Sequence, residues 1–189
     1  MKHTLHIFSG LLLAGTLMLG SCGESQQQDS KEIAEEKNDT TLTTKASEKD
    51  AQLAVDVVAS NYAEVALAKT AQQKSSNAEI KDIAGMLEND HTALIGQFKD
   101  YAAKNSVALP TEITPEAQKD VNDLADAKPA DFDKKWCNEL LDKHEATIKK
   151  LEGALNDISD ASLKTLVTDA LPKIRMHRDK LMECKNKMK

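Results

Sequence analysis

Three histidines occur where apolar residues are expected. His91, His144 and His177 each fall in the apolar stripe of a different segment whose hydrophobic residues recur every three or four positions. Glu64 occupies the inner face of a further segment of this kind. Imidazole nitrogens and carboxylate oxygens are ligands for zinc, iron, copper and manganese. The four residues are therefore a candidate site for a transition metal, and a metal-free polar network that fixes helix register is the alternative.

The spacing of these residues places them in facing pairs. Residues equidistant from the turn of an antiparallel helical hairpin lie at one level of the hairpin. Glu64 and His91 are equidistant from a predicted turn at 76–78. His144 and His177 are equidistant from a predicted turn at 159–160. We expect the members of each pair to face each other, whereas the level of one pair relative to the other depends on the connection between the hairpins.

Several acids lie close to the histidines in the sequence. Glu88 stands three residues before His91, the Glu-x-x-His spacing used in di-iron bundles. The fourth helical segment has no second copy of this motif because Ile174 occupies the place of the acid, so we do not expect a full di-iron site. Glu88 and Asp90 are candidates for an extra ligand or, like Glu145, for a partner of a histidine's second nitrogen. The alternative is that these acids are solvated or form salt bridges.

The elements that must position these residues are helices. Apolar periodicity predicts helices over about 50–75, 76–105 and 131–158, and a last helix after a tight turn at 159–160. Ser76 and Glu79 have the capping-box spacing, and Thr114-Pro115 marks the start of a short helix in the long connection. Pro172 lies inside the last helix, where we expect a kink. Two antiparallel hairpins joined by a long crossover define an all-α, ferritin-like four-helix bundle.

Two cysteines fall on the same hairpin as His144 and His177. Cys137 and Cys184 are equidistant from the turn at 159–160, and each lies one heptad from its histidine on the same helix face. We therefore expect a disulfide between them in an oxidising compartment. Two reduced thiols in the core are the alternative.

The N-terminus has the features of an export signal. Lys2 precedes an apolar stretch from Leu5 to Leu19 that is too short for a membrane span. The stretch ends in Leu19-Gly20-Ser21-Cys22, which resembles the bacterial lipobox. We expect residues 1–21 to be a lipoprotein signal peptide and Cys22 to carry the lipid. The expected location is the bacterial cell envelope, lipid-anchored, in the periplasm or at the outer membrane.

Composition divides the remaining chain into a tether and a domain. Residues 22–49, the lipidated cysteine and the polar stretch after it, contain few large apolar residues and are expected to be a disordered tether. Residues 50–189 have the size of one helical domain. The net charge of −6 argues against nucleic acid as a partner. The chain contains no nucleophile elbow, phosphate-binding glycine loop or zinc-protease motif, so hydrolase and nucleotide chemistry are not expected.

Several segments are similar to one bacterial family. They are Asn61-Tyr62-Ala63-Glu64-Val65-Ala66-Leu67-Ala68, Met86-Leu87-Glu88-Asn89-Asp90-His91-Thr92, Phe132-Asp133, Lys143-His144-Glu145 and Leu171-Pro172-Lys173-Ile174-Arg175-Met176-His177. Over about Ala51 to Leu181 the chain resembles the domain of unknown function 4142, often labelled an outer membrane protein. The resemblance implies a ferritin-like bundle in the envelope and supplies no established reaction. Cys137 and Cys184 are not part of this pattern.

Two functions are compatible with these features. The first is a metal-binding, ferritin-like module, supported by Glu64, His91, His144 and His177. The second is a non-catalytic envelope lipoprotein that binds a protein partner or supports the cell surface, supported by the missing second Glu-x-x-His and the acidic surface. The sequence does not decide whether the protein is an enzyme.

Overall fold

The part of the chain that the structure describes is entirely helical. The computed structural model describes residues 29–188, so the predicted signal peptide and the predicted lipidation site Cys22 lie outside the described residues. Between these limits there is no strand. The helices are α1 (Ser30–Thr41), α2 (Lys45–Lys74), α3 (Ala78–Asn105), α4 (Pro115–Ala125), α5 (Pro129–Ala154) and α6 (Ala161–Lys187). The predicted all-α class is confirmed.

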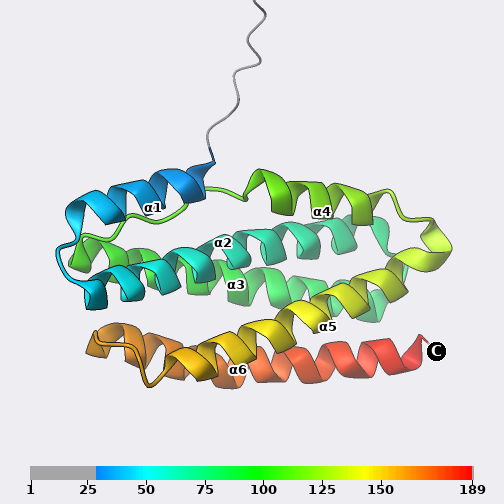
Figure 1. The fold of residues 1–189 in the computed structure, drawn as a ribbon. Coiled ribbons are helices and arrows are strands. Elements are labelled where there is room, and N and C mark those ends of the chain that lie inside the picture. Colours follow the sequence, from blue (N-terminus) through cyan, green and yellow to red (C-terminus); the bar gives the residue numbers. More distant parts are fainter. Residues whose placement is uncertain (1–28, 189) are drawn as a thin grey trace, which may run out of the picture.

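Helices α2, α3, α5 and α6 form the bundle (Figure 1). Helices α2 and α3 make one antiparallel hairpin and α5 and α6 make the other, with α2 packed on α5 and α3 packed on α6. The connection between the hairpins returns along the bundle and carries α4, so α3 and α5 run in the same direction. This is the predicted ferritin-like topology. Helix α2 begins before the expected residue 50, and α5 ends before the expected residue 158.

Side chains cap the first turns of α3, α4 and α6, and the cap of α3 differs from the prediction. The expected capping box of Ser76 and Glu79 is wrong, because the side chain of Asn77 caps α3 by accepting from the Glu79 backbone N–H. Asn is at least as good an N-cap as Ser, and its position starts the helix one residue later. Thr114 caps α4 as predicted, and Asp160 caps α6. Pro172 lies inside α6 as expected.

The predicted tether is wrong from Ser30 onward, because α1 is a packed helix. The side chains of Ala34 and Asn38 are only 2% and 4% exposed. Asn38 holds the crossover by two hydrogen bonds to one residue: its Nδ2 donates to the Ala108 carbonyl at 3.0 Å and its Oδ1 accepts from the Ala108 N–H at 2.7 Å. Helix α1 is held partly by these hydrogen bonds. The search for apolar residues at helical spacing does not detect such contacts, so it missed this helix.

The core of the bundle has two apolar clusters. One contains Leu67, Leu87, Leu141 and Leu181 together with the large side chains Phe132 and Trp136. The other contains Val58, Leu94, Ile148 and Ile174 together with Phe98 and Leu163. On α3, α5 and α6 a single buried polar residue, His91, His144 or His177, lies between the two clusters; on α2 there are two, Asn61 and Glu64. These polar residues therefore lie in a layer between two apolar clusters.

The predicted disulfide between Cys137 and Cys184 is present and joins α5 to α6. It links residues 47 positions apart in the sequence. In the chain-entropy model, closing such a loop contributes about 4 kcal/mol to stability. No helix among the described residues has the length and apolar character that a membrane crossing requires.

Candidate metal centre

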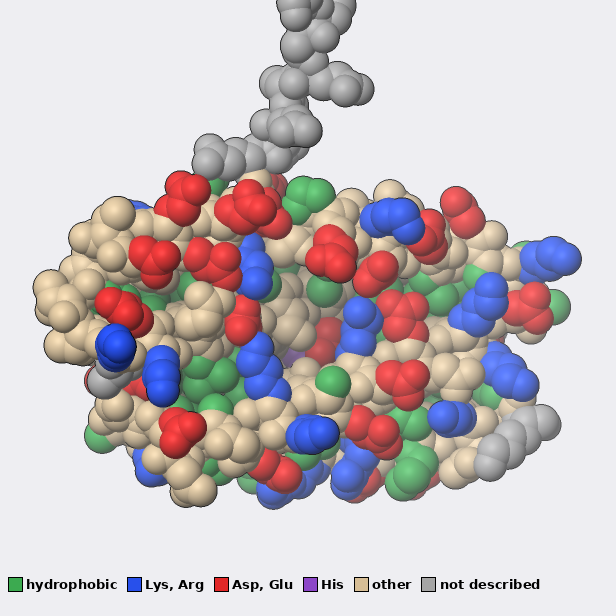
Figure 2. Space-filling view, in the orientation of Figure 1, with side chains coloured by type: hydrophobic (Ala, Val, Ile, Leu, Met, Phe, Trp, Pro, Cys, Tyr) green, Lys and Arg blue, Asp and Glu red, His purple; other side chains and the backbone are tan. Residues whose placement is uncertain are grey.

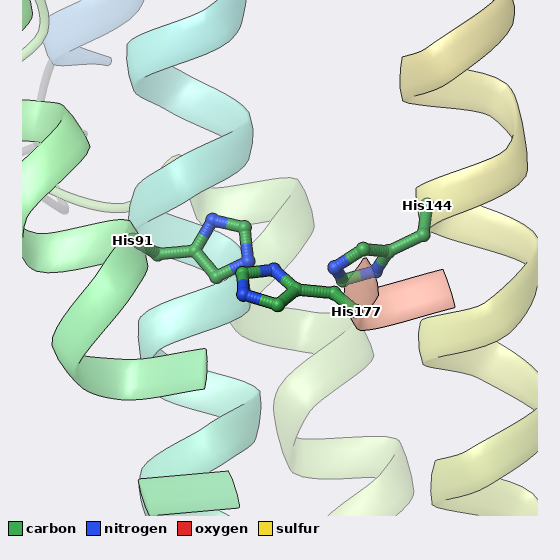
Figure 3. Close-up of side chains that lie close together, drawn as sticks. All are labelled: His91, His144 and His177. Carbon is green, nitrogen blue, oxygen red and sulfur yellow. The ribbon is translucent and has the colours of Figure 1, made fainter. Parts of the chain in front are cut away.

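One side chain from each bundle helix meets at the centre of the polar layer. Glu64 comes from α2, His91 from α3, His144 from α5 and His177 from α6. All four are buried, the most exposed of them at 3%. One nitrogen of each histidine lies within 4.8 Å of the corresponding nitrogens of the other two, and Figure 3 shows the rings converging from their separate helices. The two predicted pairs therefore share one level, which the sequence left open.

The Glu64 carboxylate lies against two of the rings. Its Oε2 is 2.9 Å from His91 Nε2 and 3.3 Å from His144 Nε2. The His144 and His177 rings are neighbours, with centroids 5.5 Å apart. The predicted facing of Glu64 with His91 and of His144 with His177 is confirmed.

The outer nitrogen of each histidine is held by an oxygen that can only accept a hydrogen bond. These pairs are His91 Nδ1 with Asn61 Oδ1 at 2.7 Å, His144 Nδ1 with the Leu140 carbonyl at 2.8 Å, and His177 Nε2 with Asp90 Oδ2 at 2.9 Å. The Asn61 amide is oriented by its own Nδ2, which donates to the Val57 carbonyl at 2.6 Å. Each outer nitrogen therefore carries the hydrogen, and in a neutral ring the inner nitrogen has a free lone pair.

The inner atoms make no hydrogen bond outside their own group. Glu64 Oε2, His91 Nε2, His144 Nε2 and His177 Nδ1 are all buried, and the polar contacts of the Glu64 oxygen are with His91 Nε2 and His144 Nε2. Lone pairs and a carboxylate oxygen that face one another away from water are costly unless something satisfies them. A divalent cation would satisfy the three histidine nitrogens, and Glu64 Oε2 lies beside two of them. Imidazoles and a carboxylate are suitable ligands for a transition metal. The three buried histidines could therefore hold a metal ion.

The electrostatics of the layer favour the ligand forms of Glu64, His144 and His177 and the protonated form of His91. Burial would raise the pKa of Glu64, but the adjacent His91 and His144 outweigh it and lower that pKa to about 2. Burial lowers the pKa of His144, and it lowers the pKa of His177 to about 4 despite the hydrogen bond to Asp90. For His91, burial is outweighed by the Glu64 charge, so its pKa is raised. Near neutral pH, His144 and His177 therefore present neutral rings next to an ionised carboxylate.

The neighbouring acids have different positions. Asp90 holds His177 as expected for a second-nitrogen partner, and Lys173 Nζ in turn donates to Asp90 Oδ1 at 2.9 Å. The expectation for Glu88 is wrong: its Oε2 accepts from Gln72 Nε2 at 2.5 Å on the flank of α3, away from the centre. Glu145 is exposed, and the Leu140 carbonyl takes the role considered for it beside His144.

Two partners of the histidines were missed by sequence reasoning. Asn61 lies one turn before Glu64 on the same inward face of α2 and is only 5% exposed. A buried amide on the apolar stripe next to a candidate ligand was a signal that could have found it. The Leu140 carbonyl had no such signal, because every helix residue carries a carbonyl and the ring orientation of His144 selects this one.

The described chain is an all-helical bundle with a buried cluster of candidate metal ligands. It belongs to the family described as a domain of unknown function (DUF4142), whose family model matches residues 35–183. The matched range includes Glu64, His91, His144 and His177. Neither the curated proteins nor the solved structures contain a significant match to the chain.

Proposed function

We propose that this protein is a lipid-anchored envelope protein whose bundle binds one transition-metal ion through Glu64, His91, His144 and His177. The observation that carries the metal proposal is the orientation of the inner atoms. Four buried ligand atoms from four helices lie together without a hydrogen-bond partner outside their own group. The opposite nitrogen of each histidine is held by an oxygen, the arrangement that fixes the tautomer and orientation of metal-bound histidines.

The ligand set narrows the choice of ion. Three imidazole nitrogens and one carboxylate oxygen suit zinc, iron, copper or manganese in the divalent state. The thiolates that would favour copper(I) or an iron–sulfur cluster are absent from the described part of the layer, because Cys137 and Cys184 are joined to each other in a disulfide. A full carboxylate-bridged di-iron site is not proposed, since Glu88 lies outside the centre.

Elemental analysis by mass spectrometry tests the metal proposal. The full chain would be purified in detergent without an affinity tag, together with His144→Ala and Glu145→Ala. We expect close to one metal ion per chain, lost in His144→Ala and retained in Glu145→Ala, whose exposed side chain is the next residue on α5. Helical circular dichroism of His144→Ala checks that its bundle still forms. Absence of metal from the wild-type chain, even after reconstitution with each of the four ions, would contradict the proposal.

A metal-free polar network is the second candidate, favoured by one contact. Glu64 Oε2 lies 2.9 Å from His91 Nε2, and the pKa of His91 is raised despite burial because of the Glu64 charge. A charged pair could then fix helix register without metal, in a structural or partner-binding lipoprotein. In that case His91→Ala should cost about 3–5 kcal/mol of unfolding free energy, because it leaves a buried carboxylate unpaired. Urea denaturation of EDTA-treated and untreated protein would then give the same stability for the wild type.

The lipid anchor is supported by the N-terminal sequence: Lys2, the apolar stretch from Leu5 to Leu19 and the lipobox-like ending at Cys22. We expect Cys22→Ser to abolish acylation and to move the protein from the membrane fraction to the soluble fraction. Incorporation of labelled palmitate, followed by fractionation, measures both effects. Equal membrane association of wild type and Cys22→Ser, with no label in either, would contradict the anchor.

A further inference from the structure

A small cavity leads from the surface to the candidate metal centre between α3 and α6. Its volume is about 100 Å³. His91 and His177, two of the candidate ligands, form part of its lining. The cavity therefore reaches the polar layer from one side of the bundle.

The lining of the cavity contains exposed and buried residues. Lys173 and Ala93 are exposed. Leu94 and Ile174 contribute buried apolar wall, at 8% and 3% exposure. His91, His177 and Asp90, the acid that holds the outer nitrogen of His177, also line the cavity.

The opposite side of the bundle has a larger groove, which does not contact the candidate ligands. Figure 2 shows a hollow in the middle of that face; a histidine is seen deep between the helices there, but no histidine lines the groove. A groove of about 530 Å³ lies between α1, α4, α2 and α5, with Ala63 and Ala146 among its lining residues. None of the four candidate ligands lines this groove. Size alone therefore does not identify the route, and contact with the ligands favours the cavity between α3 and α6.

We propose that this cavity admits a small exogenous ligand, which coordinates the bound metal on its His91 and His177 side. The inference rests on the proposed metal centre and adds the class of ligand to it. The cavity volume of about 100 Å³ is several times the roughly 10–15 Å³ of such space that one water molecule needs. The ligand class is therefore a small neutral molecule or small anion of a few heavy atoms. A purely structural metal site is closed, whereas a site that reacts with such a molecule keeps an accessible position.

Cobalt(II) substitution and azide test the inference, because cobalt absorbs visible light and azide has three atoms. In the full chain loaded with cobalt, we expect azide to change the visible spectrum saturably. Ala170→Leu, which places a larger side chain in the cavity wall, should weaken azide binding at least tenfold while cobalt stoichiometry stays the same. Ala146→Leu is the matched control, since Ala146 lines the groove on the other face, and its azide response should equal that of the wild type.

The outcomes separate this inference from the proposed function. Failure of the wild type to bind cobalt or any of the native candidate ions would contradict the metal centre itself. Cobalt binding without an azide response would overturn the cavity inference and leave the metal centre standing. An undiminished response in Ala170→Leu, or a loss in Ala146→Leu alone, would also overturn it. If Ala170→Leu does not bind cobalt, Ala93→Leu blocks the same cavity from α3 and is held to the same criterion.

Discussion

At the scale of residues, the site is defined by which atom of each ring faces inward. His91 and His144 present Nε2 to the centre, and His177 presents Nδ1. The opposite nitrogens are fixed by Asn61, the Leu140 carbonyl and Asp90. Because these partners only accept hydrogen bonds from the rings, the tautomers are set by the protein. The centre is thus oriented for a cation before one binds.

Asp90 allows a specific test, because it orients the candidate ligand His177 without itself facing the centre. It holds His177 Nε2 at 2.9 Å and is itself held by Lys173. Asp90→Asn keeps the shape of the side chain but removes its charge. We expect about 10- to 100-fold weaker metal affinity, the usual loss for such an outer partner. Competition with a chromophoric chelator measures the affinity.

Asp169→Asn is the control for this prediction. Asp169 is exposed and lines the same cavity between α3 and α6, so the substitution removes one negative charge from the same region. Metal affinity should change little in this variant. Equal losses in both variants would mean that Asp90 acts through general charge and not through its bond to His177.

Sequence reasoning recovered the inward residues and missed most of their supports. Glu64 and the three histidines stand out because a polar residue on an apolar stripe breaks the helical pattern. Glu88 was considered as an extra ligand because of its Glu-x-x-His spacing, but it lies on the flank of α3, where its carboxylate accepts from Gln72. The bond between His144 and the Leu140 carbonyl depends on a side-chain rotamer, which no spacing predicts.

At the scale of elements, α1 shows the limit of hydrophobic periodicity. Its polar sequence predicted a tether, yet it packs on the bundle through Ala34 and Asn38. The bonds from Asn38 satisfy both backbone groups of Ala108 in the crossover. A side chain that satisfies two main-chain groups can hold a segment that buries little apolar area.

We therefore expect Asn38→Ala to release α1 from the crossover. Loss of both hydrogen bonds should destabilise the docked helix by about 1–3 kcal/mol, because two main-chain groups lose their partner. Hydrogen exchange of the α1 amides should accelerate, while exchange in α3 and α6 stays unchanged. Asp39→Ala, at the exposed neighbouring position, is the control. Unchanged α1 protection in Asn38→Ala would show that other contacts hold the helix.

The two hairpins show which features of helix packing can be predicted from a sequence. The midpoint of each facing pair coincides with a turn, so the pairs and the Cys137–Cys184 disulfide were predictable. The common level of the two pairs was not, because it is set by how far the crossover carries α5 along the bundle. That distance depends on tertiary packing and not on local residue pattern.

At the scale of the whole molecule, a polar layer crosses the bundle between two apolar clusters. Each cluster draws residues from all four bundle helices, so helix sliding would disrupt both clusters as well as the layer. The apolar packing thereby fixes the four inner atoms against one another. One side of this layer meets a small cavity, and the disulfide clamps α5 to α6 at a different level.

Anomalous X-ray diffraction from crystals of the metal-loaded protein tests the central claim most directly. We predict one anomalous peak per chain, bonded to Glu64 Oε2, His91 Nε2, His144 Nε2 and His177 Nδ1 at about 2.0–2.2 Å. Data collected on both sides of the absorption edge would identify the element. A stoichiometrically loaded protein whose only peak lies elsewhere, with the Glu64–His91 contact of 2.9 Å intact, would contradict the account.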